Sequence, residues 1–138
     1  MKISFIGYKE NQVNLFKDLA KKLSKRISGL ELEERFVPFP IDLPAVANEC
    51  ANSSDFVVVF AFVEEEEMAD LIKRKLIDVE IATKTRILKY VESDGLSGID
   101  ENDYFDKKEA LVDELCNLIV SILFNEFEFE PKDKDFSV

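Results

Sequence analysis

An apolar run, Phe56–Val63, constrains the fold of this chain more than any other segment. A strand that is apolar at every position is typical of the centre of a parallel sheet, where helices cover both faces. Before this run lie Pro38 and Pro40, which forbid a continued strand, and then a short helical segment, Leu43–Ala51. This order of loop, helix and buried strand predicts a small α/β domain that can hold a ligand at the ends of its strands.

The composition is that of one globular domain. The chain has 138 residues, of which 46% are hydrophobic and 34% charged, and this length can bury a core without disulfides or metals. No run approaches the roughly 18–20 consecutive apolar residues that a membrane span needs. The apolar start of the chain is also shorter than the h-region of a secretory signal, about 7–15 residues. We therefore expect a cytoplasmic protein with no membrane partner, in which residues 1–126 form a single α/β domain and residues 127–138 a charged tail.

The charge and the missing residue types exclude several kinds of site. The net charge of −11 argues against a nucleic-acid partner, because phosphate binding needs clustered Lys and Arg. The chain contains no histidine, and its two cysteines, Cys50 and Cys116, lie in apolar helical segments with no Cys-x-x-Cys pair. We expect both to be buried free thiols. The sequence therefore predicts no metal site and no cofactor.

Strands and helices are predicted to alternate four times along the chain. The expected strands are Lys2–Ile6, Leu30–Val37 (at a sheet edge), Phe56–Val63 and Arg86–Val91. Four helices are expected: one between Asn11 and Gly29, one at Leu43–Ala51, one from Glu64 to about Thr83, and one from about Asp106 to Asn125. Asn11 and Asp42 are the expected caps of the first two helices, and Ser93–Asp106 the one long loop. With right-handed crossovers, this alternation predicts a three-layer α/β/α domain with a four-stranded parallel sheet.

Three loops are expected to meet at the carboxyl ends of these strands, where such sheets bind ligands. They are Gly7–Asn11, Pro38–Pro44 and Phe62–Glu67. A purely structural interpretation also exists for each: Tyr8 packs the rim, Asp42 caps a helix, and Glu64–Glu67 forms a solvated first turn that the helix dipole favours. The loops therefore mark a candidate site without defining its chemistry.

The segment Val37-Pro38-Phe39-Pro40-Ile41-Asp42-Leu43-Pro44 resembles a loop of the lumazine synthase and archaeal-type riboflavin synthase superfamily, whose pattern is Val-Pro-Gly-x-x-(Asp/Glu)-(Leu/Met)-Pro. The order and lengths of the elements are also similar, from the first strand to the last helix. The resemblance implies a flavodoxin-like, lumazine-synthase-like fold. It also implies a homo-oligomer, in that family a pentamer, that binds a ribityl-pyrimidine or ribityllumazine between its subunits.

The resemblance assigns roles to individual residues. Tyr8 takes the place of a ring-stacking aromatic residue, Val63 flanks the ring, and Lys107 is similar to a lysine near the last helix that faces a phosphate in lumazine synthases. The loop from Pro38 to Asp42 offers backbone groups and a carboxylate to ribityl hydroxyls. The candidate substrate-binding residues are Tyr8, Pro38, Phe39, Ile41, Asp42, Val63, Glu64 and Lys107.

Two departures from the family pattern favour one activity over the other. Phe39 stands where the family has a glycine, and Glu64–Glu67 stands where lumazine synthases carry a proton-carrying histidine. Four carboxylates repel a substrate phosphate, whereas transfer between two ribityllumazines needs no phosphate. Archaeal-type riboflavin synthase activity is therefore favoured over lumazine synthase activity.

A second class of function stays open: a non-catalytic, flavodoxin-like oligomerisation or ligand-binding module. The last helix carries apolar residues over more than one stripe, which is typical of a helix that also meets another subunit. Two other α/β families are disfavoured. The first loop has only one glycine, Gly7, against a dinucleotide-binding fingerprint, and the Phe56–Val63 strand does not end in the phospho-acceptor aspartate of a response regulator.

Overall fold

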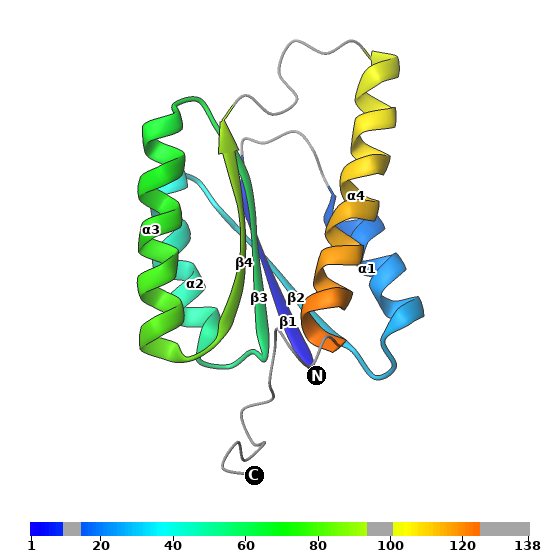
Figure 1. Ribbon diagram of the computed structural model, residues 1–138, viewed down its shortest axis with the longest axis horizontal. Helices are drawn as coiled ribbons and strands as arrows, with labels where there is room; N and C mark the ends of the chain where they lie inside the picture. Colours follow the sequence, from blue (N-terminus) through cyan, green and yellow to red (C-terminus); the bar gives the residue numbers. More distant parts are fainter. Residues whose placement is uncertain (10–14, 94–100, 125–138) are drawn as a thin grey trace.

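The computed structural model describes residues 1–9, 15–93 and 101–124 and shows a four-stranded sheet between two pairs of helices (Figure 1). The strands are β1 (Lys2–Tyr8), β2 (Glu31–Val37), β3 (Phe56–Val63) and β4 (Arg86–Ser93); the helices are α1 (Phe16–Arg26), α2 (Leu43–Ala51), α3 (Glu66–Thr83) and α4 (Glu101–Phe124), with a 3-10 turn, η1 (Pro40–Asp42), before α2. The predicted three-layer, flavodoxin-like α/β fold is confirmed. No helix in these ranges is long and apolar enough to cross a membrane. The predicted tail, residues 127–138, lies outside them.

The strand order places a topological switch at the centre of the sheet. The four strands are parallel in the order β2-β1-β3-β4, so β2 is an edge strand, as predicted. Helices α1 and α4 cover one face of the sheet, and α2 and α3 cover the other (Figure 1). The chain builds outward from β1 to β2 and then resumes on the other side of β1 with β3. Ligands of open α/β sheets bind at the carboxyl ends beside such a switch.

The centre of the core is β3, whose side chains are buried on both faces. Phe56 and Val58 pack with α1 and α4, whereas Val57 and Val59 pack with α2 and α3. All four are at most 1% exposed. This double burial explains why the strand is apolar throughout, and it confirms the prediction of a central parallel strand.

Several element boundaries differ from the prediction. Strand β1 continues past Ile6 to Tyr8, because Tyr8 pairs with Val37 and thereby satisfies further backbone groups on β2. Helix α4 begins at Glu101, within the segment predicted to be loop. The first residues of this helix are mostly polar, so they show no apolar periodicity from which a helix could be predicted, although such residues are compatible with a helix. The predicted cap Asn11 lies outside the described residues.

The end of α1 also differs from the prediction. The helix ends at Arg26, because Ile27 already has extended dihedrals, with φ −124° and ψ 116°. Gly29 was expected to stop the helix, but it serves the turn that follows, where its φ of +67° is in the left-handed region that favours glycine. The glycine therefore directs the chain into β2 after the helix has ended.

The prediction that Asp42 caps α2 through its side chain is wrong. Asp42 belongs to η1 and has helical dihedrals, with φ −81° and ψ −10°, and its side chain makes no capping hydrogen bond. A capping side chain normally projects from a residue with extended backbone. Here the 3-10 turn leads the chain into α2, and the Asp42 N–H donates a hydrogen bond to the Phe39 carbonyl at 3.0 Å. Pro44 lies in the first turn of α2, as predicted.

A single carboxylate of α3 holds the start of edge strand β4. The Ile87 backbone N–H donates to Glu80 Oε2 at 2.7 Å, and the Lys89 ammonium donates to Glu80 Oε1 at 2.5 Å. Lys89 also donates to the Ile87 carbonyl at 3.0 Å. Both charged side chains are about a quarter exposed or less, at 24% and 21%. Glu80 thus ties an edge strand to the helix that covers it.

Candidate functional site

The carboxyl ends of all four strands lie along one edge of the sheet, which we call the carboxyl edge (Figure 1). Strand β1 ends there at Tyr8, β2 at Val37 and β3 at Val63. The segment from Pro38 to Asp42 leaves β2 at this edge and leads through η1 into α2. The structure therefore brings the second and third predicted loops, and the described part of the first (Gly7 to Lys9), to the edge at which the switch between β1 and β3 lies; Asn11 is outside the described residues.

The predicted binding residues divide into buried and exposed groups. Val63 is only 6% exposed, and Tyr8 is half-buried against the core beneath α2 and α3. Phe39 and Ile41 are 63% and 50% exposed on the loop after β2. Glu64 is also exposed. The loop thus presents two large apolar side chains to solvent, whereas the side chain of Val63 is buried beneath the carboxyl edge and is not exposed to a ligand.

Lys107 lies apart from these residues. It is exposed on α4, which covers the sheet face opposite to α2 and α3. The loop from Pro38 to Asp42 instead leads into α2 on the other face. Within one subunit, Lys107 and this loop therefore lie on different sides of the sheet.

An aromatic row crosses the sheet on the α1/α4 side, one residue before the ends of β1 and β2 and three residues before the ends of β3 and β4. Gly7 of β1 pairs with Phe36 of β2 and with Phe60 of β3, and Phe60 pairs with Tyr90 of β4. The rings of Phe60 and Tyr90 stack, with centroids 5.2 Å apart and planes at 20°. Phe62 contacts Phe60 edge-on at 5.1 Å. These side chains (Phe36, Phe60, Phe62 and Tyr90) are called the aromatic row below.

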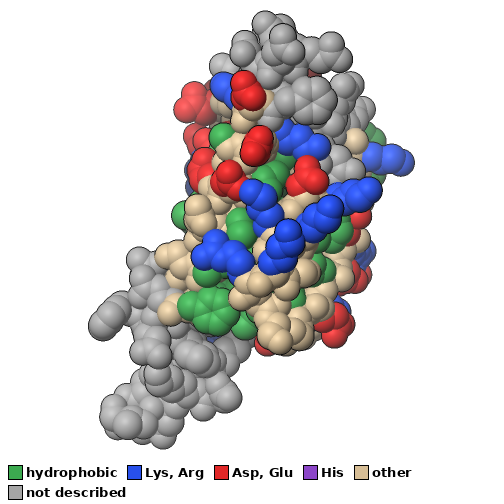
Figure 2. Space-filling model, turned by 90° about the vertical axis from the view of Figure 1, so that its right-hand side faces the viewer, with side chains coloured by type: hydrophobic (Ala, Val, Ile, Leu, Met, Phe, Trp, Pro, Cys, Tyr) green, Lys and Arg blue, Asp and Glu red, His purple; other side chains and the backbone are tan. Residues whose placement is uncertain are grey.

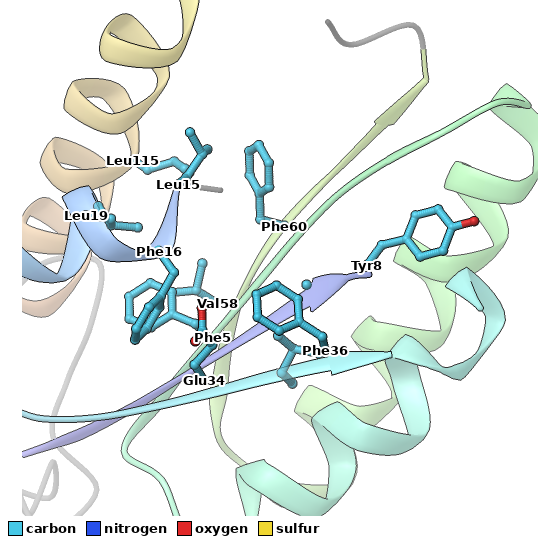
Figure 3. Close-up of a pocket in the computed structure, with 12 residues that line it drawn as sticks. Phe5, Tyr8, Leu15, Phe16, Leu19, Glu34, Phe36, Val58, Phe60 and Leu115 are labelled. Atoms are coloured by element: carbon cyan, nitrogen blue, oxygen red, sulfur yellow. The ribbon is translucent and has the colours of Figure 1, made fainter. Parts of the chain in front are cut away.

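A small cavity of about 40 Å³ opens beside Gly7, between Phe36 and Phe60 of the aromatic row. Its lining includes Phe5, Phe16, Phe36 and Phe60, with the carboxylate of Glu34 at the rim (Figure 3). The Phe36 ring lies over Gly7: a Cβ atom at position 7 would be 2.9 Å from Phe36 Cε1. Glycine therefore lets this ring fold over β1, and the 51% exposed Phe36 closes the cavity from the edge strand.

Tyr8 contributes its backbone, and not its ring, to this cavity. Its ring points away from Phe36 and Phe60, toward the side of α2 and α3 (Figure 3). Successive residues of a strand face opposite sides of the sheet, so Gly7 and Tyr8 cannot present side chains to the same face. The carboxyl edge therefore has one aromatic residue on the α2/α3 side and the aromatic row on the other.

Glu34 is the ionisable group of the cavity rim. Removal of water by the neighbouring rings raises the pKa of its carboxyl group above the usual value. The folded chain therefore binds this proton more readily than the unfolded chain. The charge on Glu34 lowers stability at neutral pH, and this cost disappears as the pH falls below the unfolded pKa. Because the side chain stays exposed, the effect is small.

We expect the Glu34→Gln variant to melt slightly higher than wild type at about pH 7 and at the same temperature at about pH 3, where the carboxyl is protonated in both states. Thermal unfolding followed by circular dichroism measures both. Glu31→Gln, on the same strand, controls for the change in net charge. A difference that persists unchanged at low pH would contradict the assigned cause.

The two cysteines are buried and free, as predicted, and they lie on opposite faces of the sheet. Cys50 belongs to the core under α2 and α3, and Cys116 to the core under α1 and α4. Among the described residues, no three His, Cys, Asp or Glu side chains gather in a way that could hold a metal ion.

Comparison with known proteins adds no family assignment. No family model matches this sequence, and a search of curated proteins finds no significant match either. The functional argument therefore rests on the topology, the loop at the carboxyl edge and the aromatic row.

Sequence reasoning missed Phe36, Phe60, Tyr90 and Glu34, none of which is among the predicted binding residues. A partial signal was present, because Glu34 and Phe36 are alternate residues of one strand and so share a face. The position of Phe36 relative to Phe60 along the strands depends on the register between strands, which a single sequence does not reveal. Only the paired register shows that these rings form one row.

Proposed function

We propose that this chain binds a ribityllumazine-like ligand at the carboxyl edge, as a riboflavin-pathway protein of the lumazine/riboflavin synthase type. The observation that carries the proposal is the position of the loop from Pro38 to Asp42, which leaves β2 at the carboxyl edge, where the switch between β1 and β3 lies; the aromatic row approaches the same edge from the α1/α4 side of the sheet. Flat heterocycles favour aromatic faces, and polyol hydroxyls favour fixed polar groups. The carboxyl edge supplies both, the rings on the α1/α4 side of the sheet and the polar groups of the loop on the α2/α3 side.

Different residues of the site would contact different parts of the ligand. The exposed Phe36 ring offers a face for the planar ring system, and Phe60 lies behind it across the small cavity. Asp42, which makes no capping hydrogen bond, offers its carboxylate to ribityl hydroxyls. Glu64 and the carboxylates that follow it repel a phosphate, which favours the riboflavin synthase reaction over the lumazine synthase reaction.

A titration with ribityllumazine tests the proposal. Ligand fluorescence reports binding, the visible absorbance of riboflavin reports turnover, and light scattering reports the mass of the assembly. We expect saturable binding with slow production of riboflavin by a homo-oligomer, a pentamer if the family resemblance extends to assembly. A complete absence of binding would overturn the proposed function and leave the fold unaffected.

The missing histidine supports a second candidate, a ligand-binding module without activity. Histidine is the side chain that ordinarily titrates near neutral pH, and the chain has none. A relative that keeps the aromatic row and has lost proton transfer would bind ribityllumazine and produce no riboflavin. The same titration separates the two candidates, because fluorescence and absorbance report different steps.

Phe60→Ala is expected to weaken ribityllumazine binding about tenfold, which corresponds to the loss of one aromatic stacking contact. Ile81→Ala is the matched control, because Ile81 is 71% exposed on α3 and does not line the cavity. Fluorescence titration measures both affinities, and circular dichroism confirms that both variants fold. Equal affinities of Phe60→Ala and wild type for ribityllumazine would show that the aromatic row is not part of the binding site.

A further inference from the structure

Helix α1 has a charge balance unlike the rest of the chain. The whole protein carries a net charge of −11. The basic residues of α1 are Lys17, Lys21, Lys22, Lys25 and Arg26, and Asp18 is its sole acidic residue. Figure 2 shows Lys and Arg side chains gathered in a band across the α1/α4 face of the molecule. The proposed ligand site does not use these cations.

Two of these cations are engaged within the fold. Lys22 forms an ion pair with Asp113 of α4, and Arg26 donates to the Asn117 side chain at 3.0 Å. These contacts attach α1 to α4. The remaining three, Lys17, Lys21 and Lys25, are exposed, and within the described residues they have no ion-pair or hydrogen-bond partner.

The three unpaired lysines form a regular row. They are spaced four residues apart, so each lies roughly 6 Å further along the helix axis and on nearly the same side of it. Lys17, Lys21 and Lys25 are called the lysine row below. Like charges at this spacing repel one another, so the row is unfavourable in an isolated molecule. An opposite charge placed against it would relieve that repulsion.

The opposite face of the same chain carries the complementary charge. Glu64, Glu65, Glu66 and Glu67 are all exposed, and within the described residues none has an ion-pair partner. This acidic segment leads into α3 and forms its first two residues, and α3 lies across the sheet from α1 (Figure 1). The lysine row and the acidic segment therefore cannot meet within one molecule, but they can meet between two.

We propose that the lysine row of one copy of this chain docks against the acidic segment, Glu64–Glu67, of a second copy. The two surfaces differ, so the contact is heterologous; repeating it gives a closed ring where the rotation between subunits closes and an open chain of subunits where it does not. A nucleic-acid partner for the lysine row is disfavoured, because three lysines neutralise few phosphates, and it is an outcome of the test below. The inference rests on charge alone and is independent of the proposed ligand.

Reversing the charge on each surface tests this contact. The first variant is Lys17→Glu/Lys21→Glu/Lys25→Glu, and the second is Glu64→Lys/Glu66→Lys/Glu67→Lys. The control variant changes three exposed lysines on other segments (Lys9→Glu/Lys75→Glu/Lys84→Glu) and so alters net charge by the same amount as the first. Light scattering measures the mass of each full-length protein at low and high salt, and circular dichroism confirms folding.

We expect wild type and the control to form oligomers at low salt that dissociate at high salt, because exposed charges are screened. Each charge-reversed variant alone should be a monomer of 15.9 kDa. An equal mixture of the two should associate again, because the new glutamates of one then face the new lysines of the other. This mixing result also stands if one variant is less stable than wild type.

Four results would overturn the inference. One is a wild-type protein that is monomeric at low salt. Another is a first variant that keeps the wild-type mass, and the third is a mixture of folded variants that fails to associate. Retention of wild type on heparin with no change in mass would also overturn it, in favour of a polyanion partner. Because mass is measured without ligand, a failure of ribityllumazine binding leaves this test intact.

Discussion

Replacing Phe56 by alanine is expected to lower the free energy of unfolding by about 3–5 kcal/mol. Phe56 is fully buried in the central strand β3 and packs in the core beneath α1 and α4. Truncation removes the transfer free energy of the ring and leaves a cavity, which the rigid sheet closes only in part. Urea unfolding followed by circular dichroism measures this difference.

Phe36→Ala is the matched control for this prediction. The substitution is the same, but Phe36 lies on the edge strand with 51% of its surface exposed. We expect a loss of about 1 kcal/mol, because much less apolar area is buried there. Equal losses at the two positions would mean that the core is not centred on β3.

The second large effect is expected at Glu80. Glu80→Ala should lower the free energy of unfolding by about 2 kcal/mol, because the Ile87 N–H loses a carboxylate acceptor and Lys89 loses its ion pair. Urea unfolding measures the loss. Glu80→Gln keeps an oxygen acceptor for the Ile87 N–H, so we expect it to lose about half as much.

An exposed ion pair provides the comparison for Glu80. Arg35 and Glu49 lie 3.3 Å apart with exposed side chains, and Glu49→Ala should cost less than about 1 kcal/mol. If Glu80→Ala were as mild as Glu49→Ala, the edge strand would not depend on the carboxylate. Hydrogen exchange at the Ile87 amide gives an independent measure, and we expect faster exchange in Glu80→Ala.

Elements with strong local signals were predicted well from the sequence. The limits of α2 and β3 agree with prediction, since Pro44 marks the helix start and unbroken apolar sequence marks the strand. The edge position of β2 was also predicted, from its alternating charged residues. These features depend on a few neighbouring residues, which a single sequence displays directly.

Features that depend on tertiary pairing were predicted less well. The last residues of β1 are held by their partners on β2, which the local sequence does not show. The start of α4 lacks an apolar pattern, and the entry to α2 uses a turn and not a side-chain cap. For the site, the carboxyl edge followed from topology, whereas the aromatic row required the register between strands.

The all-parallel sheet has a consequence for how the chain folds. Every pairing of neighbouring strands spans a helical crossover, and the central pair joins Ile3 to Phe56. No hairpin is available as a local nucleus, so a long loop must close before the middle of the sheet gains any stability. Chains with such distant contacts fold more slowly than helical bundles. We therefore expect the docking of β3 beside β1 to limit the folding rate, with α1 and α3 forming earlier.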